Sequence, residues 1–185
     1  MVVGEGLIKR TVVKEQRFAL GRAIKQLSDG SFLAKLLGPK DLSRLVAAAV
    51  LPYHPNSPIA TYPGESLDDL AKKVNKALPR KIRKTLEELM REKAPEVAKV
   101  PDYDVYLRGV AHSANRAGLT MCNDLPQALM HLTREVPELK EKRLNTTDEI
   151  VAALSRHASF CELLRFAVSE EYFRLRARMK FSITA

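Results

Sequence analysis

Apolar residues recur every three or four positions along most of the chain, which is the spacing of one face of an α-helix. The first such segment is Lys14 to Leu27, and Gly30 follows it as a residue suited to ending a helix. A short apolar connector, Ser31 to Leu37, then leads to a second helix. We expect Asp41 to cap this second helix, which runs through Leu51.

The same periodicity continues to the end of the chain. It predicts further helices from Ser66 or Glu65 to Leu78, from Pro79 onward, from Asp102 to about Met121, after the cap Asp124, from the cap Thr147 to Leu154, and from about Phe160 to Met179. The opening residues, MVVGEGLI, are typical of a strand that runs into a glycine turn. The chain is therefore predicted to be mainly α, with a short N-terminal strand.

A length of 185 residues favours one domain with one sizeable core, covering residues 1–185. Two interruptions are expected within it: a proline-rich loop at about 52–64 and a polar connector at about 137–146. A lone strand needs a partner strand. We therefore expect the chain to be a fragment of a longer protein.

The composition is that of an ordinary globular protein, with 45% apolar and 29% charged residues. No apolar run approaches the roughly 20 residues that span a bilayer, and the N-terminus lacks a secretory signal. Cys122 and Cys161 are far apart and have no metal-ligating neighbours. We expect both thiols to be reduced and buried, in a cytoplasmic protein.

The formal net charge of +9 has two interpretations. Basic residues are dense at Arg80, Lys81, Arg83 and Lys84, and again from Arg174 to Lys180. They can form a surface for nucleic acid or another polyanion, or they can be the solvated sides of lysine-rich helices. No aromatic residue is interleaved with either basic stretch in the way that base stacking requires. Both interpretations remain open.

Familiar catalytic motifs are missing from the sequence. It contains no G-x-S-x-G elbow and no glycine-rich phosphate loop, and its 8 glycines never form G-x-G-x-x-G. The histidines have no mutual spacing typical of a metal site: His54, His112, His131 and His157. The sequence therefore indicates no positive catalytic activity.

The first predicted helix has two distinct faces. Leu20, Ile24 and Leu27 fall on an apolar face, as expected for a helix packed against a core. Arg22 and Gln26 lie one turn apart on another face. Positions i and i+4 of a helix are where a zinc peptidase carries its two histidines. The segment is either an ordinary core helix or a zinc-site helix whose ligands have been replaced.

A second segment, RGVAHSANRAGLTMCNDLPQAL, favours the latter interpretation. It resembles the second helix of H-E-x-x-H zinc metallopeptidases of the gluzincin kind, which usually reads E-x-x-A-D-R-A-G. The matching residues are Ser113, Ala114, Arg116, Ala117, Gly118 and Leu119. In that family the opening glutamate is the third zinc ligand and an aspartate follows it. The corresponding positions here are Ala111 and Asn115.

The N-terminal stretches VVGEGLI and FALGRAIKQ fit the order of the strand and first zinc helix of the same family. By this resemblance Arg22 and Gln26 replace the two histidines, and Ala23 replaces the glutamate base. Catalytic zinc needs about three protein ligands and a base, whereas arginine offers only donors and a permanent positive charge. The resemblance thus implies a zincin-like remnant without catalytic residues, metal or other cofactor. We expect purified protein to carry no stoichiometric zinc.

The resemblance covers residues 1–30 and 102–135. The C-terminal ELLRFAVSEEYFRLRARM is similar to the ends of large bacterial proteins that place a tetratricopeptide-repeat region ahead of such a domain. We therefore expect a non-catalytic scaffold or protein-interaction module without a membrane span, in a larger assembly or a repeat-containing chain.

The resemblance also implies a former substrate cleft beside the replaced zinc ligands. This former cleft either binds an acidic peptide or C-terminal carboxylate through Arg22, or is filled by its own side chains. The alternative function is a basic helical domain that binds nucleic acid or another polyanionic surface.

Overall fold

The computed structural model describes residue 9 and residues 12–55, 66–97, 102–140 and 146–181. Helices make up most of these ranges, and no strand occurs within them. The predicted mainly α class is therefore confirmed. The short strand predicted at the N-terminus falls on residues 1–8, which lie outside the described residues.

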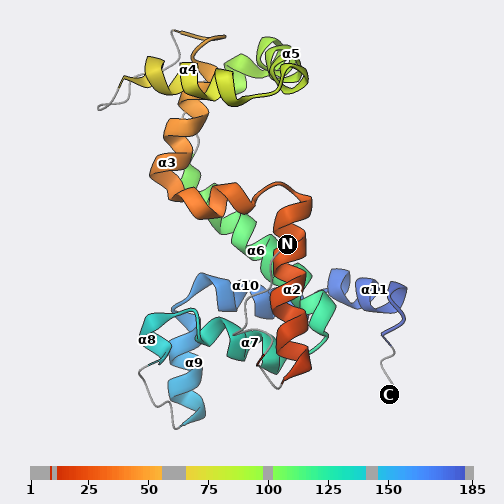
Figure 1. Cartoon of the computed structure of the whole chain (residues 1–185). Helices are drawn as coiled ribbons and strands as arrows, with labels where there is room; N and C mark the ends of the chain where they lie inside the picture. The colour runs from red at the N-terminus through yellow and green to blue at the C-terminus, as the bar shows by residue number, and fades with distance from the viewer. Residues whose placement is uncertain (1–8, 10–11, 56–65, 98–101, 141–145, 182–185) are drawn as a thin grey trace. The chain divides into compact units, whose positions relative to one another are not determined.

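Ten helices lie within the described residues, and Figure 1 labels them along the chain. They are α2 (Val13–Ser28), α3 (Phe32–Val50), α4 (Leu67–Ala77), α5 (Arg80–Val97), α6 (Tyr103–Cys122), α7 (Leu125–Thr133), α8 (Pro137–Lys140), α9 (Thr147–Ser155), α10 (Ala158–Ala167) and α11 (Glu170–Arg178). Gly30 has the positive φ of 68° expected just after α2. Two predicted caps are also confirmed: Asp102 Oδ1 accepts from the Val105 N–H at 2.9 Å, and Asp124 Oδ1 accepts from the Gln127 N–H at 3.0 Å.

The prediction of a connector from Ser31 to Leu37 is wrong, because most of this segment belongs to α3. That helix is interrupted only at Gly38, where φ is 72° and ψ is 176°. Glycine tolerates this positive φ, and the fixed φ of Pro39 suits the first turn of the helix that resumes there. Asp41 therefore lies inside the resumed helix and is not its cap.

The single C-terminal helix predicted from about Phe160 to Met179 is also wrong. The chain forms α10 and α11, with a break at Ser169, whose Oγ accepts from the Tyr172 N–H at 3.2 Å. This local bond gives the backbone an alternative to a continuous helix. The cap of α9 is Thr146, one residue before the predicted Thr147, and it forms a reciprocal capping box with Glu149.

The chain divides into two compact units. The larger unit contains residues 1–32 and 108–185, and the smaller unit contains residues 33–107. This division does not test whether residues 1–185 fold as one domain, so the single domain remains a prediction. Only the first residues of the proline-rich loop at 52–64 are described, and they lie mostly in turns. The polar connector at 137–146 contains the short helix α8, and its residues 141–145 lie outside the described residues.

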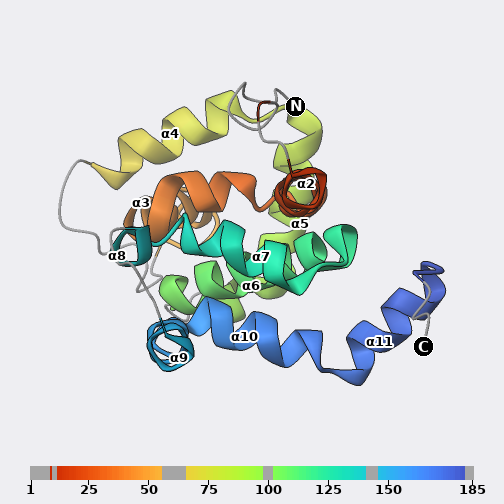
Figure 2. The ribbon, with the colours of Figure 1, turned by 90° about the horizontal axis from the view of Figure 1, so that it is seen from below.

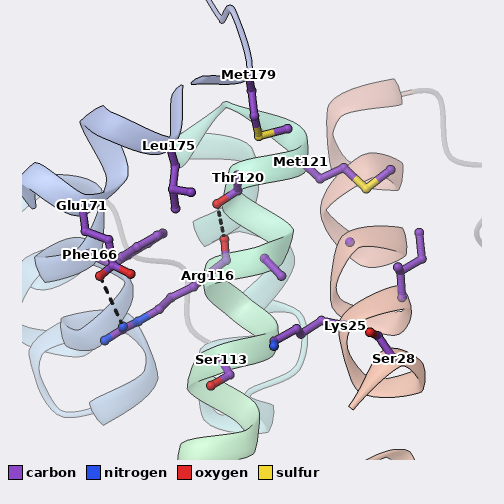
Figure 3. A pocket seen from close by; sticks show the side chains of 13 residues that line it. Lys25, Ser28, Ser113, Arg116, Thr120, Met121, Phe166, Glu171, Leu175 and Met179 are labelled. Carbon is purple, nitrogen blue, oxygen red and sulfur yellow. Dashed lines mark hydrogen bonds and ion pairs between the residues drawn. The ribbon is translucent and has the colours of Figure 1, made fainter. Parts of the chain in front are cut away.

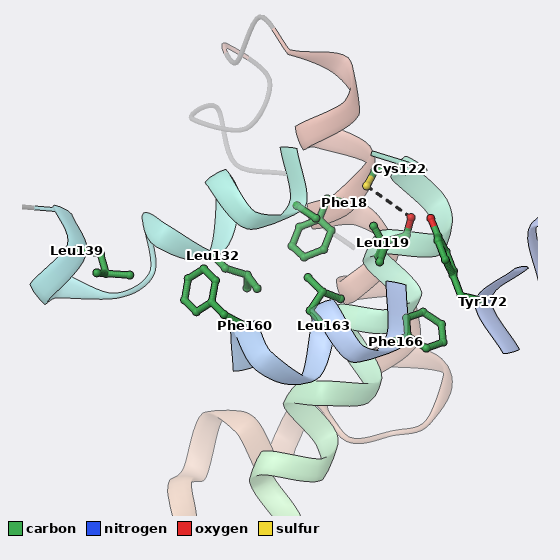
Figure 4. Packing of buried hydrophobic residues seen from close by; sticks show 10 residues of the cluster. Phe18, Leu119, Cys122, Leu132, Leu139, Phe160, Leu163, Phe166 and Tyr172 are labelled. Atoms are coloured by element: carbon green, nitrogen blue, oxygen red, sulfur yellow. Dashed lines mark hydrogen bonds between the residues drawn. The ribbon is translucent and has the colours of Figure 1, made fainter. Parts of the chain in front are cut away.

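The core of the larger unit forms where α2, α6, α7 and α10 meet. Phe18, Leu119 and Leu163 come from three of these helices and are completely buried. Figure 4 shows them pointing toward one another and toward Leu132 of α7. Helix α7 lies beside α10 in both ribbon views (Figures 1 and 2). Burial of these apolar side chains is the main force that holds the four helices together.

The smaller unit has its own buried residues. They are Ala34, Leu42, Ala47, Ala48 and Val50 of α3, Ala71 of α4 and Met90 of α5. Most of these side chains are small, so they bury little apolar area per residue. Within the described ranges, none of the helices is both long and apolar enough to cross a bilayer.

Both cysteines are free thiols, as predicted. Cys122 is buried in the core of the larger unit, and this burial raises the pKa of its thiol. Cys161 is only half-buried, so the prediction that both side chains are buried is wrong for this residue. Its position on α10, directly after the buried Phe160, points it partly away from the core.

Candidate functional site

Helices α2 and α6 cross in close contact at two glycines in the larger unit. A Cβ atom on Gly21 would lie 2.9 Å from the Ala117 carbonyl oxygen. A Cβ atom on Gly118 would lie 2.8 Å from the Phe18 carbonyl oxygen and 2.9 Å from Cγ of Arg22. Only glycine permits such a close approach of two helix backbones. The two segments that the sequence singles out therefore lie side by side.

The buried face of α2 differs from its apolar face. Glu15, Phe18, Gly21, Arg22 and Gln26 are buried, at the three-to-four-residue spacing of one helical stripe. By contrast, Ile24 and Leu27 are 47% and 46% exposed. The apolar stripe of the sequence is thus not the face that enters the core, and charged side chains are buried in its place.

Arg22 forms a bidentate salt bridge with Glu135, a residue that lies just beyond the end of α7. Its Nη1 and Nη2 donate to Oε1 and Oε2 of Glu135 at 2.7 and 2.9 Å, the bidentate geometry that suits a guanidinium and a carboxylate. The guanidinium carbon also lies 5.5 Å from the centroid of the Phe18 ring. The positive charge of Arg22 is therefore already neutralised within the chain.

Three further side chains extend this bridge into an α2–α7 ion-pair cluster of Glu15, Arg22, His131, Arg134 and Glu135. Nδ1 of His131 lies 3.3 Å from Oε1 of Glu15, and Nε2 lies 3.5 Å from Oε1 of Glu135. Arg134 donates to the same oxygen of Glu15, a side chain that is only 2% exposed. The cluster joins α2 to α7 by charge-assisted hydrogen bonds.

Sequence reasoning did not find Glu15, Arg134 or Glu135. One local signal was present, because His131 and Glu135 are four residues apart and so face one another near the end of a helix. The link to α2 had no such signal, since 113 residues separate Arg22 from Glu135.

The other positions that correspond to the metal site of the zinc metallopeptidases differ in how far they are buried. Gln26 and Asn115 are buried at 8% and 2% exposure, whereas Ala23 and Ala111 are half-buried. Among the described residues, Oδ1 of Asn115 has no hydrogen-bond partner. No group of three or more His, Cys, Asp or Glu side chains in those residues could hold a metal ion. Guanidinium, amide and methyl groups do not fit the zinc that the resemblance would place here.

An open groove of about 710 Å³ lies along α2 (Figure 3). Arg22 and Gln26 are not among its lining residues. Helices α2, α6, α10 and α11 all contribute to its walls. Its apolar lining is Gly21, Ile24, Ala117, Met121, Phe166, Leu175 and Met179, and its polar lining is Lys25, Ser28, Ser113, Arg116, Thr120 and Glu171. The groove therefore offers apolar contacts with a few polar groups among them.

Arg116 fixes one wall of this groove. Its guanidinium donates to Oε1 of Glu162 on α10, lies 3.9 Å from Oε2 of Glu171 and stands 5.1 Å from the centroid of the Phe166 ring. The hydrogen bond to Glu162 raises the already high pKa of Arg116. The second cation of the groove is Lys25. Among the described residues it pairs with Asp29, which lies four residues away and is similarly exposed. An exposed pair of this kind contributes about 0.3–0.5 kcal/mol, so Lys25 can exchange Asp29 for another carboxylate.

The candidate anion-binding residues Arg80, Lys81, Arg83 and Lys84 lie in the first turns of α5, in the smaller unit, and all are exposed. The second basic stretch, from Arg174, belongs to α11 of the larger unit. The two basic stretches therefore belong to different units.

Compared with models of known families, with curated protein sequences and with solved structures, the chain shows no match. Function is therefore inferred from the residues themselves.

The pKa of the Glu135 carboxyl implies a defined response to acid. Burial would raise this pKa, but hydrogen bonds from His131 and Arg22, together with the charge of Arg22, outweigh burial and hold it well below its usual range. A carboxyl whose pKa is lowered in the folded state stabilises the fold above its unfolded-state pKa, which is about 4.3. That contribution is lost as the pH falls from there toward the lower folded-state pKa.

We therefore expect the free energy of unfolding to fall as the pH drops below about 4.5, and to fall less steeply in E135Q. Urea denaturation of both proteins at pH 7, 5, 4 and 3 measures this difference. E170Q is the control, because Glu170 is 78% exposed and its ion pair in the described part of the chain is with Arg174, one turn away. Identical pH dependence in E135Q and the unaltered protein would contradict the expectation.

Proposed function

We propose that this chain is a non-catalytic, metallopeptidase-like helical domain that serves as a scaffold or protein-interaction module in the cytoplasm. The groove between α2, α6, α10 and α11 carries this proposal, because its walls present exposed apolar side chains. The chemistry at the metal positions is consistent with it. Arg22 is paired with Glu135 and Ala23 offers no base, so these positions support packing and not hydrolysis.

The occupant we propose is an amphipathic helix of a partner protein, with an acidic side chain at one end. Figure 3 shows Met121, Leu175 and Met179 near one end of the groove, and Lys25 and Ser28 toward the other. The apolar end suits the apolar stripe of a helix, the usual mode of helix-in-groove recognition. Lys25 suits a carboxylate, and the net charge of +9 favours an acidic partner in general. The partner would belong to a larger assembly or to a tetratricopeptide-repeat chain.

The groove is tested with two fluorescein-labelled helical peptides of about 20 residues, identical except for one Glu or Gln at the end expected to meet Lys25. We expect fluorescence anisotropy to show tighter binding of the Glu peptide to the full chain. M179E is expected to weaken binding by tenfold or more, because it places a charge in the apolar end of the groove. F173E is the matched control, since Phe173 lies outside the groove and is 45% exposed, against 46% for Met179.

Two results would refute the docking proposal. One is that neither peptide binds, and the other is that F173E weakens binding as much as M179E does. K25Q is expected to abolish the preference for Glu over Gln without affecting the apolar contacts. A preference that survives in K25Q would refute the assigned orientation of the helix.

The non-catalytic part of the proposal has a separate test. The 185-residue chain, incubated with zinc and then desalted, is expected to retain far less than one zinc per chain by elemental analysis, and to leave a generic peptide substrate uncleaved. One zinc bound per chain would refute this part, whatever the peptide-binding result.

A further inference from the structure

We propose that the smaller unit carries a second binding surface, for the phosphate backbone of double-stranded nucleic acid. The surface is the α4–α5 basic segment, Lys72 to Lys84. Seven of its thirteen residues are Lys or Arg, and none is Asp or Glu. All seven cations are exposed: Lys72, Lys73, Lys76, Arg80, Lys81, Arg83 and Lys84. The proposal is independent of the groove, because the segment belongs to the other unit.

Most of these cations have no acidic partner among the residues that the structure describes. In the described part of the chain, Lys72 lies 3.5 Å from Asp69 and Lys84 lies 3.9 Å from Glu88, while the remaining five form no ion pair. The cations later in α5 differ, since Arg91 pairs with Glu87 at 2.6 Å. A solvated helix face is usually laced with such i,i+4 pairs. The α4–α5 basic segment therefore carries uncompensated positive charge.

The position of this charge works against the helix that bears it. Arg80, Lys81 and Arg83 fall in the first turn of α5, which contains no acidic residue. The N-terminal end of a helix already carries partial positive charge, so cations are unfavourable there. A bound polyanion would remove this repulsion.

The side chains around the cations indicate which polyanion fits. No aromatic residue occurs between Leu67 and Val97, so bases cannot be stacked as single-strand binding proteins stack them. Contact with phosphates alone suits a duplex and carries no sequence information. An anionic membrane would be favoured by several exposed apolar residues among the cations, but Ile82 is the only large apolar side chain exposed within the segment.

The probes are two fluorescein-labelled 20-base-pair DNA duplexes of unrelated sequence and, separately, vesicles containing 30% phosphatidylserine. We expect the full chain to bind both duplexes with similar affinity at 50 mM salt. The slope of log affinity against log salt is expected to be about −4.5, or about −0.9 for each of five phosphate contacts. K81Q/R83Q should weaken binding by tenfold or more and reduce the slope by about two.

R91Q/K93Q is the matched control, because it removes two positive charges from the same helix. Arg91 and Lys93 already have acidic partners, Glu87 for the first and Glu92 and Glu96 for the second. This variant should keep most of the affinity and nearly all of the slope. Circular dichroism tests whether both variants remain helical.

Several outcomes would overturn the proposal. They are the absence of duplex binding at 50 mM salt, equal weakening by the two double variants, strong preference for one duplex sequence, and binding to vesicles but not to duplexes. M179E should leave duplex binding unchanged, so failure of the groove and failure of the basic surface remain distinguishable.

Discussion

Replacing Gly118 by alanine is expected to destabilise the fold by roughly 1–3 kcal/mol, the range observed for overpacking a tight contact. The new Cβ atom would lie 2.8 Å from both the carbonyl oxygen and Cδ2 of Phe18. The ring of Phe18 is completely buried and cannot move aside freely. Backbone atoms of α2 must therefore shift, which disturbs the core contacts of both helices. Urea denaturation followed by circular dichroism measures the change.

Gly109 provides a control of opposite sign in the same helix. A Cβ atom on Gly109 meets nothing within 4 Å, and the residue is exposed. Because alanine favours a helix interior over glycine by about 0.5–1 kcal/mol, G109A should stabilise the protein. If G118A also stabilises it, the close crossing of α2 and α6 is wrong.

Replacing Arg22 by methionine is expected to destabilise the fold by about 2 kcal/mol. Breaking a fully buried ion pair typically costs about 3–5 kcal/mol, but the Glu135 side chain is 46% exposed, which lowers the penalty. Methionine keeps part of the packing of Arg22 against Gly118. The loss therefore reports mainly the broken bridge to Glu135.

A double-mutant cycle separates the bridge from packing. R22M/E135M replaces both partners by apolar side chains. Its free energy of unfolding is expected to be closer to that of the unaltered protein than the free energy of unfolding of R22M is. K25M is the control on the same helix. It breaks only the exposed pair with Asp29 and should change stability by about 0.5 kcal/mol or less.

The same variants test the alternative role of Arg22, which is to bind an acidic peptide or a C-terminal carboxylate. If R22M leaves stability unchanged but weakens binding of an acidic peptide, Arg22 serves a ligand and not the fold. That result would restore the interpretation in which the former cleft binds a carboxylate.

Local chemistry explains which parts of the fold can be predicted from sequence. Asp102 and Asp124 cap α6 and α7 as expected, because a cap depends on groups within three residues. Gly38 and Ser169 also act locally, but the sequence pattern does not predict the breaks that they cause. The apolar run before Gly38 is compatible with a connector or a helix, and Ser169 lies in a stretch whose periodicity hides the break.

The candidate site depends on contacts that are distant in sequence. The sequence patterns place Arg22 and Gly118 in two segments that resemble zinc-site helices. The structure brings these two residues together where α2 crosses α6. The groove along Ile24 and Met121 was not predicted, because it requires four helices to meet. No periodicity within one helix specifies the neighbours of that helix.

The sequence by itself determined the helical class, most helix boundaries, the uneven positive charge and the lack of familiar catalytic motifs, since each of these depends on residue type and short-range spacing. Tertiary structure alone decided that Glu15 and Arg22 face inward while Ile24 and Leu27 stay exposed. The physical reason is that a charged side chain can be buried when a partner of opposite charge lies within hydrogen-bonding distance. For Arg22 that partner is Glu135, and only the folded chain brings the two together.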